Sequence, residues 1–572
     1  MKRKPLSVAL LLMLLSSACA TPSPRASSEA PPPATLSKKQ IVGSILGDPP
    51  GIHQELISPA PSSASVPGLG EVVAMLNGAL TYLDGENTRH PWLAEAVPTV
   101  ENGLWTVFGD GRMETTWRIK PGTKWQDGTP LTAEDLRFTL DVYRDRETGV
   151  LDLPILRFVE GIEARDPQTA VVKWPQPYIE ADTLFGSGVT MWLLPKHILE
   201  QPFQESKANF LSLPHWRESF VGAGPFKMQA WTSGSHAVLV ANDDYVLGRP
   251  RLDQIEVRFF TDKGALKAGL LAGAVNTHIG RGFNSVDVLQ IRDASQDVKV
   301  KLGGLLGGVL PIYPQSINPV PPILANPRFR RALLMTIDRQ EMTDTINNGL
   351  GPVAHSWVQA DYPEGRAVEG SVVRYQYDPR AATQMIEALG FSKGADGTFQ
   401  AADGTKLSVQ IQTHEQNSYH VPTTLSVVRY WQQIGLDVQT DVVSTTRSLD
   451  REWRSLYPSF FLTSMGVLSR PDALFSRRGI PLPENNFVGS NAARYGSAEL
   501  DGLIDRYTRT IPFRERMAVL GEMVRQQTDQ VTMLPLFFQG SAYVLGSPAL
   551  QNVLAGQVWN AHLWALDQDG RS

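Results

Sequence analysis

The stretch WRIKPGTKWQDGTPLTAEDLRFTLDVYRD, residues 117–145, carries a dense succession of local structural signals. The segment ETTWRI, residues 114–119, overlaps the start of this stretch, and its composition and patterning predict a strand. Pro121-Gly122 and Asp127-Gly128 each predict a tight turn, and Lys124-Trp125 between them predicts a short strand. The first half of the stretch therefore predicts a strand that runs through two turns.

The second half of the stretch predicts a helix. Thr132 is followed three residues later by Asp135, which is the spacing of a capping-box pair at a helix N-terminus. Apolar residues Leu136, Phe138 and Leu140 follow this pair. We therefore expect a capped helix directly after the second turn.

Helices and strands alternate along the rest of the sequence. Further strands are predicted at residues 169–174, 237–241 and 255–260. Further helices are predicted at residues 70–83, 327–347, 381–390, 423–434, 498–510 and 514–529. This interleaving predicts α/β architecture rather than a helical bundle or a β-sandwich. Since no sequence repeat of fixed period is present, a solenoid or a propeller is not expected.

Length and composition restrict the class of protein. The chain has 572 residues, more than one hydrophobic core of about 250–300 residues can organise, so several domains are expected. Hydrophobic residues make up 42% and charged residues 19%, which is typical of a globular protein and excludes wholesale disorder. The net charge of −5 offers no electrostatic basis for binding nucleic acid. A single cysteine excludes an intramolecular disulfide and a four-cysteine zinc site.

That single cysteine, Cys19, follows a stretch typical of a secretory signal, residues 1–18. Three basic residues precede an apolar stretch at residues 6–15, which would be about 15 Å long as a helix, too short to span a bilayer. The small residues Ser16, Ser17 and Ala18 then lead into the cysteine, and this order resembles a bacterial lipoprotein box. The resemblance implies that Cys19 is lipidated and becomes the first mature residue; the alternative is an ordinary signal peptide with an incidental cysteine.

Residues 19–40 are rich in proline, serine, alanine and threonine and hold almost no large apolar side chain. Such a segment buries too little surface to offset its ordering entropy, so we expect a flexible linker behind the lipid anchor. The longest later apolar stretch, residues 302–313, is broken by four glycines and a proline, and no transmembrane helix is predicted. The expected location is extracytoplasmic, in the periplasm or at the outer face of the cell membrane.

Sequence motifs of catalysis are missing. The chain has neither the GxxxxGK[ST] loop of nucleotide hydrolases nor the GxSxG elbow of serine hydrolases. His414 and His420 are six residues apart, so on one helix they would point to different faces and could not share a metal ion. No enzyme activity, metal or cofactor is therefore predicted.

The quoted stretch resembles the signature block of bacterial extracellular solute-binding proteins of the dipeptide, oligopeptide and nickel type. In that family the pattern R-x-G-x-x-(F/W)-x-D-G-x-P-(L/V)-T-A-x-D covers a strand, two turns and a capped helix. Here Lys120 and Pro121 replace the arginine and its neighbour, and the other positions match from Gly122 to Asp135. Further segments match the family in the same order, at residues 76–85, 91–97, 193–199, 221–231, 241–260, 270–276, 326–342, 377–391, 431–438 and 534–538.

This resemblance implies an α/β fold, a two-lobed periplasmic-binding-protein clamshell with an extra α/β subdomain in lobe I. Lobe I is expected to combine residues 41–82, 179–297 and 531–572, with residues 83–178 as its extra subdomain. Residues 298–530 are expected to form lobe II.

The function that the resemblance implies is capture of a peptide-like solute between the lobes by a substrate-binding lipoprotein of an ABC importer. Its expected partners are the permease and ATPase subunits and the membrane that holds the lipid anchor, and the chain is expected to be a monomer that binds no nucleic acid. Alternatives are an extracytoplasmic sensor or chaperone with the same clamshell, a binder of a non-peptide solute, and a secreted hydrolase, against which the missing motifs count.

One segment bears on the ligand. In peptide binders of the family, a lobe II segment G-W-G-A-D-Y-x-D-P lines the cleft, and its aspartate pairs with the α-ammonium group of the peptide. The corresponding residues here are 462–475, in which Met465 replaces the tryptophan, Gly466 matches, and Leu468 stands where the acid is expected. Asp472 could take the place of that acid if the loop runs differently. The resemblance thus implies a ligand site at Ser464, Met465, Gly466, Leu468 and Asp472, and the missing acid favours a blocked, cyclic, cationic or non-peptide solute.

Overall fold

The strand expected at residues 114–119, the turns and the capped helix are present in the computed structural model. The short strand expected at Lys124-Trp125 is not, because Lys124 forms only an isolated bridge with Pro130. The structure describes residues 38–57, 66–151, 153–187, 191–303, 307–415, 417–466 and 471–567. Strand β5 (Met113–Arg118) leads to the two turns, and helix α3 (Ala133–Arg144) follows them. The capping box is complete, since the carboxylate of Asp135 accepts a hydrogen bond of 2.7 Å from the backbone N–H of Thr132.

A four-stranded antiparallel sheet surrounds β5, in the order β4 (Trp105–Val107), β5, β7 (Thr169–Trp174) and β6 (Gly161–Asp166). Every other residue of β5 is buried, as expected for a strand with one face on the core. The sheet lies wholly within residues 83–178, the range expected to form an extra subdomain.

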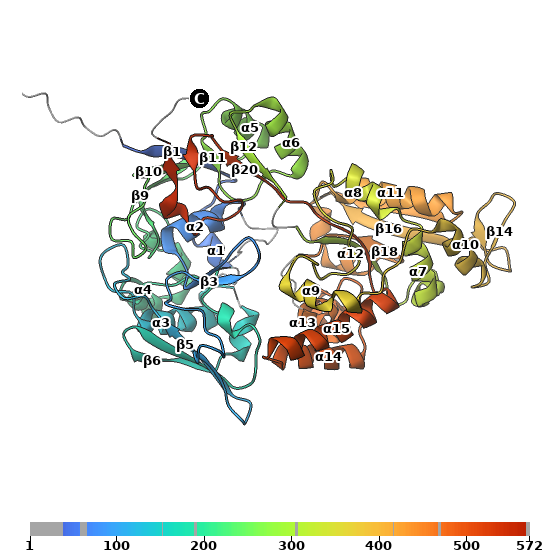
Figure 1. Ribbon diagram of the computed structural model, residues 1–572, viewed down its shortest axis with the longest axis horizontal. Helices are drawn as coiled ribbons and strands as arrows, with labels where there is room; N and C mark the ends of the chain where they lie inside the picture. The colour runs from blue at the N-terminus through green and yellow to red at the C-terminus, as the bar shows by residue number, and fades with distance from the viewer. Residues whose placement is uncertain are drawn as a thin grey trace, which may run out of the picture. The chain divides into compact units, whose positions relative to one another are not determined.

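A five-stranded mixed sheet is assembled from segments that are far apart in the sequence (Figure 1). Its order is β11 (Thr277–His278), β1 (Gln40–Leu46), β10 (Gln254–Phe260), β9 (His236–Ala241) and β8 (Phe226–Thr232). β1 runs parallel to both β10 and β11, whereas β10, β9 and β8 are antiparallel neighbours.

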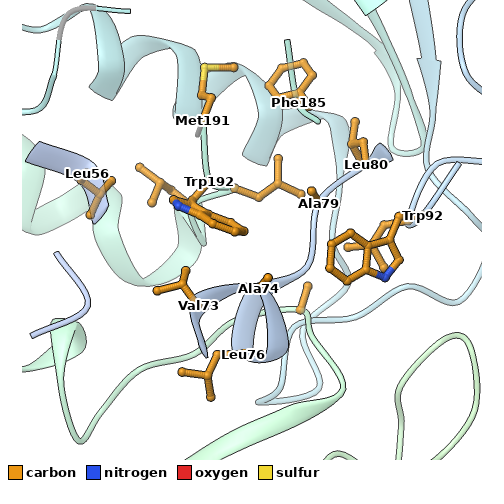
Figure 2. Packing of buried hydrophobic residues seen from close by; sticks show 14 of the residues in the cluster. Leu56, Val73, Ala74, Leu76, Ala79, Leu80, Trp92, Phe185, Met191 and Trp192 are labelled. Atoms are coloured by element: carbon orange, nitrogen blue, oxygen red, sulfur yellow. The ribbon is translucent and has the colours of Figure 1, made fainter. Parts of the chain in front are cut away.

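One hydrophobic core serves both of these sheets. It contains Trp117 of β5, Ile45 of β1 and Val257 of β10 together with the apolar face of α2 (Leu69–Asn77). Figure 2 shows ten of its members gathered around α2: Leu56, Val73, Ala74, Leu76, Ala79, Leu80, Trp92, Phe185, Met191 and Trp192. The shared core joins the four-stranded and five-stranded sheets into one packed half of the chain.

A second five-stranded sheet has a separate core. Its order is β17 (Asp437–Val443), β16 (Ser408–His414), β18 (Phe460–Leu462), β13 (Val309–Pro314) and β19 (Leu534–Phe538). β16 is parallel to β17 and β18, while β13 is antiparallel to β18 and β19. Ile312, Ile411 and Leu534 are fully buried in this core.

The remaining elements are short strands and helices (Figure 1). The strands are β2 (Thr81–Leu83), β3 (Arg89–Pro91), β12 (Lys299–Leu302), β14 (Ser392–Lys393), β15 (Phe399–Gln400), β20 (Ala542–Gly546), β21 (Leu550–Gln551) and β22 (Ala565–Leu566). The helices are α1 (Gln54–Ile57), α4 (Lys196–Glu205), α5 (Lys263–Leu271), α6 (Ser285–Ala294), α7 (Pro327–Met335), α8 (Arg339–Thr345), α9 (Pro363–Val368), α10 (Pro379–Glu387), α11 (His420–Gln433), α12 (Arg451–Ser455), α13 (Pro471–Phe475), α14 (Ala498–Arg509) and α15 (Phe513–Gln530). Within the described residues, none of these helices combines the length and the apolarity that a membrane span requires.

Two antiparallel segments connect the two large sheets. β12 pairs with β20 on one side, and β13 pairs with β19 on the other. Between them, the N–H of Gly303 donates to the carbonyl of Ser541 at 2.9 Å, and the N–H of Gln539 donates to the carbonyl of Gly308 at 3.0 Å. The chain therefore changes from one sheet to the other between Gly303 and Gly308 and again at residues 539–541. The lobe boundaries at 298 and 530 stay a prediction.

Two of the predicted helices are wrong in extent. Residues 70–83 form α2 and then β2, because the helix ends at Gly78, whose positive φ of 73° favours glycine. Residues 327–347 form α7 and α8, because Asp338 caps a new helix by accepting a hydrogen bond of 2.9 Å from the N–H of Glu341.

Candidate functional site

The hydroxyl of Ser464, two residues after β18, is the centre of a polar cluster. Its Oγ lies 2.9 Å from Nε2 of His420, 3.1 Å from Nε2 of Gln539 and 3.3 Å from Nδ2 of Asn417. Since the two amide groups donate to Ser464, its own hydrogen is directed to the imidazole of His420. The other ring nitrogen of His420, Nδ1, then donates to the carbonyl of His414 at 3.3 Å.

His414 and His420 meet, contrary to the expectation from their spacing. Their rings are perpendicular with centroids 4.6 Å apart, because β16 ends at His414 and α11 begins at His420, so one helix does not contain both. Burial lowers the pKa of His414 to about 4, with Arg454 acting in the same direction. Burial also lowers the pKa of His420 to about 3, and His414 adds to the effect. The pair is therefore neutral near pH 7, which favours a structural hydrogen-bonding role.

No metal centre accompanies the pair. Over the residues that the structure describes, three or more histidine, cysteine, aspartate or glutamate side chains nowhere come together in a group that could hold an ion. Two neutral imidazoles that already bond Ser464, Thr463 and the carbonyl of His414 are not a ligand set by themselves.

The other residues of the predicted ligand segment lie in different environments. Met465 is only 3% exposed and packs in a core cluster, and its N–H donates to the carbonyl of Val309 at 2.9 Å. Gly466 is exposed, and Asp472 is half-buried on α13. Leu468 and Cys19 lie outside the described residues. Burial of Met465 in the core leaves Ser464 and Gly466 as the more accessible members of the segment, and a ligand-binding role for all five residues stays a prediction.

A tyrosine next to this cluster reaches the first half of the chain. The hydroxyl of Tyr419 lies 2.7 Å from Oγ of Ser285, the first residue of α6, and donates to the carbonyl of Gly540 at 3.4 Å. α6 packs in a core with β12 and β20, whereas Tyr419 packs in the core of the second sheet. One side chain thus contacts both halves and the connecting segment 539–541.

Sequence reasoning missed Tyr419, Asn417 and Gln539. The dense run of polar and aromatic residues HEQNSYH, residues 414–420, is a signal that could have drawn attention to the first two. Gln539 carries no such signal, because its role depends on the pairing of connecting segments that are more than two hundred residues apart in sequence.

Two half-buried carboxylates, Asp182 and Glu71, have a raised pKa. Burial raises the pKa of Asp182, although Arg89, with its Nε 3.6 Å away, and Arg516 of α15 oppose the shift. Nearby, the N–H of Ile179 donates to the carbonyl of Thr508 at 3.1 Å, a contact between the first half of the chain and α14. The ionised form of a poorly hydrated carboxylate would be stabilised by a positively charged group on a ligand.

Glu71 of α2, like Asp182, has a raised pKa. Burial raises its pKa, and Arg281 opposes the shift. The charges of Glu71 and Arg281 also act on the hydroxyl of Tyr543 in β20, whose pKa is raised mainly by burial. Tyr362, just before α9, has a pKa raised to about 12 by burial and by Tyr543. Acidic, basic and phenolic groups from both halves therefore share one electrostatic environment.

Comparison with known proteins identifies relatives of this architecture. Residues 88–479 match the family model described as bacterial extracellular solute-binding proteins, family 5 Middle. The oligopeptide-binding protein AppA of Bacillus subtilis is 26% identical over 463 residues, which cover 79% of this chain and 76% of AppA. A Brucella ovis protein named as an ABC transporter peptide-binding protein is 26% identical over 379 residues, which cover 65% of this chain. The chain spans 66% of the length of that relative, just under two thirds.

Solved structures agree in fold. The structure of the periplasmic oligopeptide-binding protein of an oligopeptide ABC transporter from Thermotoga maritima superposes with a TM-score of 0.73 at 18% identity, covering 93% of this chain and 100% of that one. The structure of AppA in complex with a nonapeptide gives a TM-score of 0.65 at 20% identity, covering 92% and 98%. The fold is therefore the two-lobed α/β fold of periplasmic solute-binding proteins, as predicted.

Proposed function

Because the chain belongs to the bacterial extracellular solute-binding proteins of family 5, we propose that it is the solute-binding component of an ABC importer, which captures a peptide-like solute and delivers it to a membrane permease. The observation that carries the proposal is the pairing of Gly303 and of residues 307–308 with residues 539–541, where side chains from both halves meet. Such a connection allows the halves to move relative to each other without loss of either core.

Capture requires only a difference in affinity between two conformations. A solute that contacts both halves in the closed form, and one half in the open form, shifts the population toward closure. A shift from 1:99 to 99:1 requires about 5.5 kcal/mol of differential binding. None of these steps breaks a covalent bond, so we propose a binding role without catalysis.

The names of the relatives support a peptide-like solute, since AppA is an oligopeptide-binding protein. We propose that the segment that contains Ser464, Met465, Gly466, Leu468 and Asp472 faces the bound solute.

Native mass spectrometry of the chain purified from its own host tests the proposal, because a closed solute-binding protein retains cargo through purification. A retained peptide would support it. A retained non-peptide solute would leave capture in place and overturn the ligand class. A sensor or chaperone would be indicated if uptake of labelled peptides by cells were unchanged after deletion of this chain.

Leu468→Asp should raise the affinity for peptides with a free α-amino group. The family's aspartate pairs with this ammonium group, and a buried ammonium without a carboxylate partner costs several kcal/mol. Calorimetric titration with a free-amino peptide and with its N-acetylated form measures the effect. Tighter binding of the free-amino peptide alone is expected, and equal affinities of the variant and the natural chain for both peptides would remove Leu468 from the site.

Cys19→Ser should release the chain from membranes. We propose that Cys19 carries the lipid that anchors the chain, and the serine hydroxyl cannot replace the thiol in this modification. Immunoblots of membrane and soluble fractions, after cell disruption and high-salt washing, measure the distribution. Ser17→Thr, which leaves the cysteine intact, is the matched control. Unchanged membrane association of Cys19→Ser would show that the anchor is elsewhere.

A further inference from the structure

A cavity of about 640 Å³ lies at the end of β13 that is remote from the connecting segments. Its walls come from residues 315–320 after β13, residues 456–458 before β18, residues 482–484 and Arg494. The lining consists of Gln315, Ile317, Asn318, Val320, Leu456, Tyr457, Pro458, Leu482, Pro483, Glu484 and Arg494.

The cavity is separate from the polar cluster at Ser464. Pro458 lines the cavity just before β18, and Ser464 follows the other end of this strand. Six residues of extended chain span about 20 Å, so one ligand of amino-acid size does not reach both places.

Arg494 is the distinctive member of the lining. Its side chain is buried, with only 6% of the residue exposed. Nε donates to the carbonyl of Pro481 at 3.1 Å and Nη1 donates to the carbonyl of Ser455 at 3.2 Å. Throughout the described part of the chain, no hydrogen bond of Nη2 is found and no aspartate or glutamate oxygen lies within 4.0 Å of this guanidinium. A buried positive charge is usually paired, so an arginine held only by two carbonyls has capacity for an anion.

The backbone at this cavity is also unusual. Arg494 has a φ of 52°, in the left-handed region that an arginine rarely occupies, and Asn318, which also lines the cavity, has the same value. Such conformations are strained and persist where the surrounding structure holds them, often at ligand sites.

We propose that this cavity is a second binding site, which takes a small-molecule carboxylate with an apolar body. The Nη2 amino group of the guanidinium, which makes no hydrogen bond within the described residues, supplies a charged donor for a carboxylate. Leu456, Val320 and Leu482 supply an apolar wall for the rest of the molecule. The carboxylate of Glu484 at the rim opposes ligands of higher negative charge, which favours a single carboxylate over a phosphate.

Fluorine NMR with 4-fluorobenzoate tests the site on the full chain. Saturable binding is expected, and the neutral analogue 4-fluorobenzyl alcohol should bind at least tenfold more weakly because it cannot pair with Arg494. Arg494→Met should weaken binding of 4-fluorobenzoate at least tenfold. If the alcohol and the benzoate bind within twofold of each other, the proposal is overturned.

A second pair of variants keeps the test independent of the folding of Arg494→Met. Leu456→Trp fills the cavity from a position that is 48% exposed, and Leu449→Trp adds the same side chain at a position that is 59% exposed and outside the lining. Leu456→Trp should abolish binding of 4-fluorobenzoate, whereas Leu449→Trp should leave it unchanged. Binding that survives Leu456→Trp, or that is lost equally in both variants, contradicts the assignment. The outcome does not bear on solute capture between the halves.

Discussion

Acidification from pH 7 to pH 5.5 should reduce the free energy of unfolding by several kcal/mol, because buried histidines, among them His215, His278, His414 and His420, must stay neutral in the folded chain. Burial lowers the pKa of His215 and His420 to about 3 and that of His278 and His414 to about 4. Each residue titrates near its ordinary pKa of 6.5 once the chain unfolds. Below that pH the unfolded chain binds more protons than the folded one, so stability is complete above pH 6.5 and falls toward pH 4.

Each histidine contributes about 1.2 kcal/mol to this difference, which makes the total a large share of a typical folding free energy. Urea unfolding followed by tryptophan fluorescence measures it. The interval from pH 7 to pH 8.5 is the control, because the unfolded histidines are then mostly neutral and the midpoint should change little from this cause. Equal midpoints at pH 7 and pH 5.5 would contradict the burial of these rings.

His215→Phe identifies the contribution of a single ring. Both ring nitrogens of His215 are buried without a hydrogen-bond partner in the described structure, and the ring packs against Trp216 and Phe220. Phenylalanine fits an aromatic cluster and has no proton to bind. The difference between the two pH values should therefore shrink by about 1 kcal/mol, since the contribution of one ring is removed.

Gly308→Ala should reduce stability by about 3 kcal/mol, because the connecting segment at Gly308 passes directly against the backbone of residues 465–466. A Cβ atom at Gly308 would lie 1.7 Å from the carbonyl oxygen of Met465 and 3.1 Å from Cα of Gly466. Both atoms belong to the backbone, so relief requires displacement of the segment that carries Ser464. The contact between the N–H of Met465 and the carbonyl of Val309 would be lost with it.

Gly85→Ala is the matched control for this substitution. A Cβ atom there meets nothing within 4 Å, and the backbone of Gly85 is not in the left-handed region. Urea unfolding midpoints of the two variants should differ widely, with Gly85→Ala close to the natural chain. If Gly308→Ala unfolds at the same urea concentration as the natural chain, the close approach between these segments is not a feature of the protein in solution.

Local sequence signals predicted the elements that depend on neighbouring residues. The pair Thr132 and Asp135 fixes the start of α3 through contacts three residues apart, and the prediction is confirmed. The break between α7 and α8 is also local, since it depends on the N-cap at Asp338. This cap was not predicted, because the apolar periodicity of residues 327–347 continues across the break.

The polar cluster could not be predicted in the same way. Ser464 was predicted from a resemblance, but its hydrogen-bond partners were not. They are His420 of α11, Asn417 just before that helix, and Gln539 in the connecting segment. Their meeting depends on the order of strands in the second sheet, in which β18 lies between β16 and β13. Strand order arises from long-range packing, so the spacing of His414 and His420 in the sequence gave the wrong answer about their proximity.

Small-angle X-ray scattering of the chain with and without a peptide mixture tests the central claim, which is that a solute is enclosed by movement of two halves. The chain is first freed of cargo by unfolding and refolding, then incubated with casein hydrolysate, and the retained molecules are identified by mass spectrometry. The account predicts a smaller radius of gyration after incubation, together with retained peptides. Identical scattering profiles, with no molecule retained from the mixture, would contradict it.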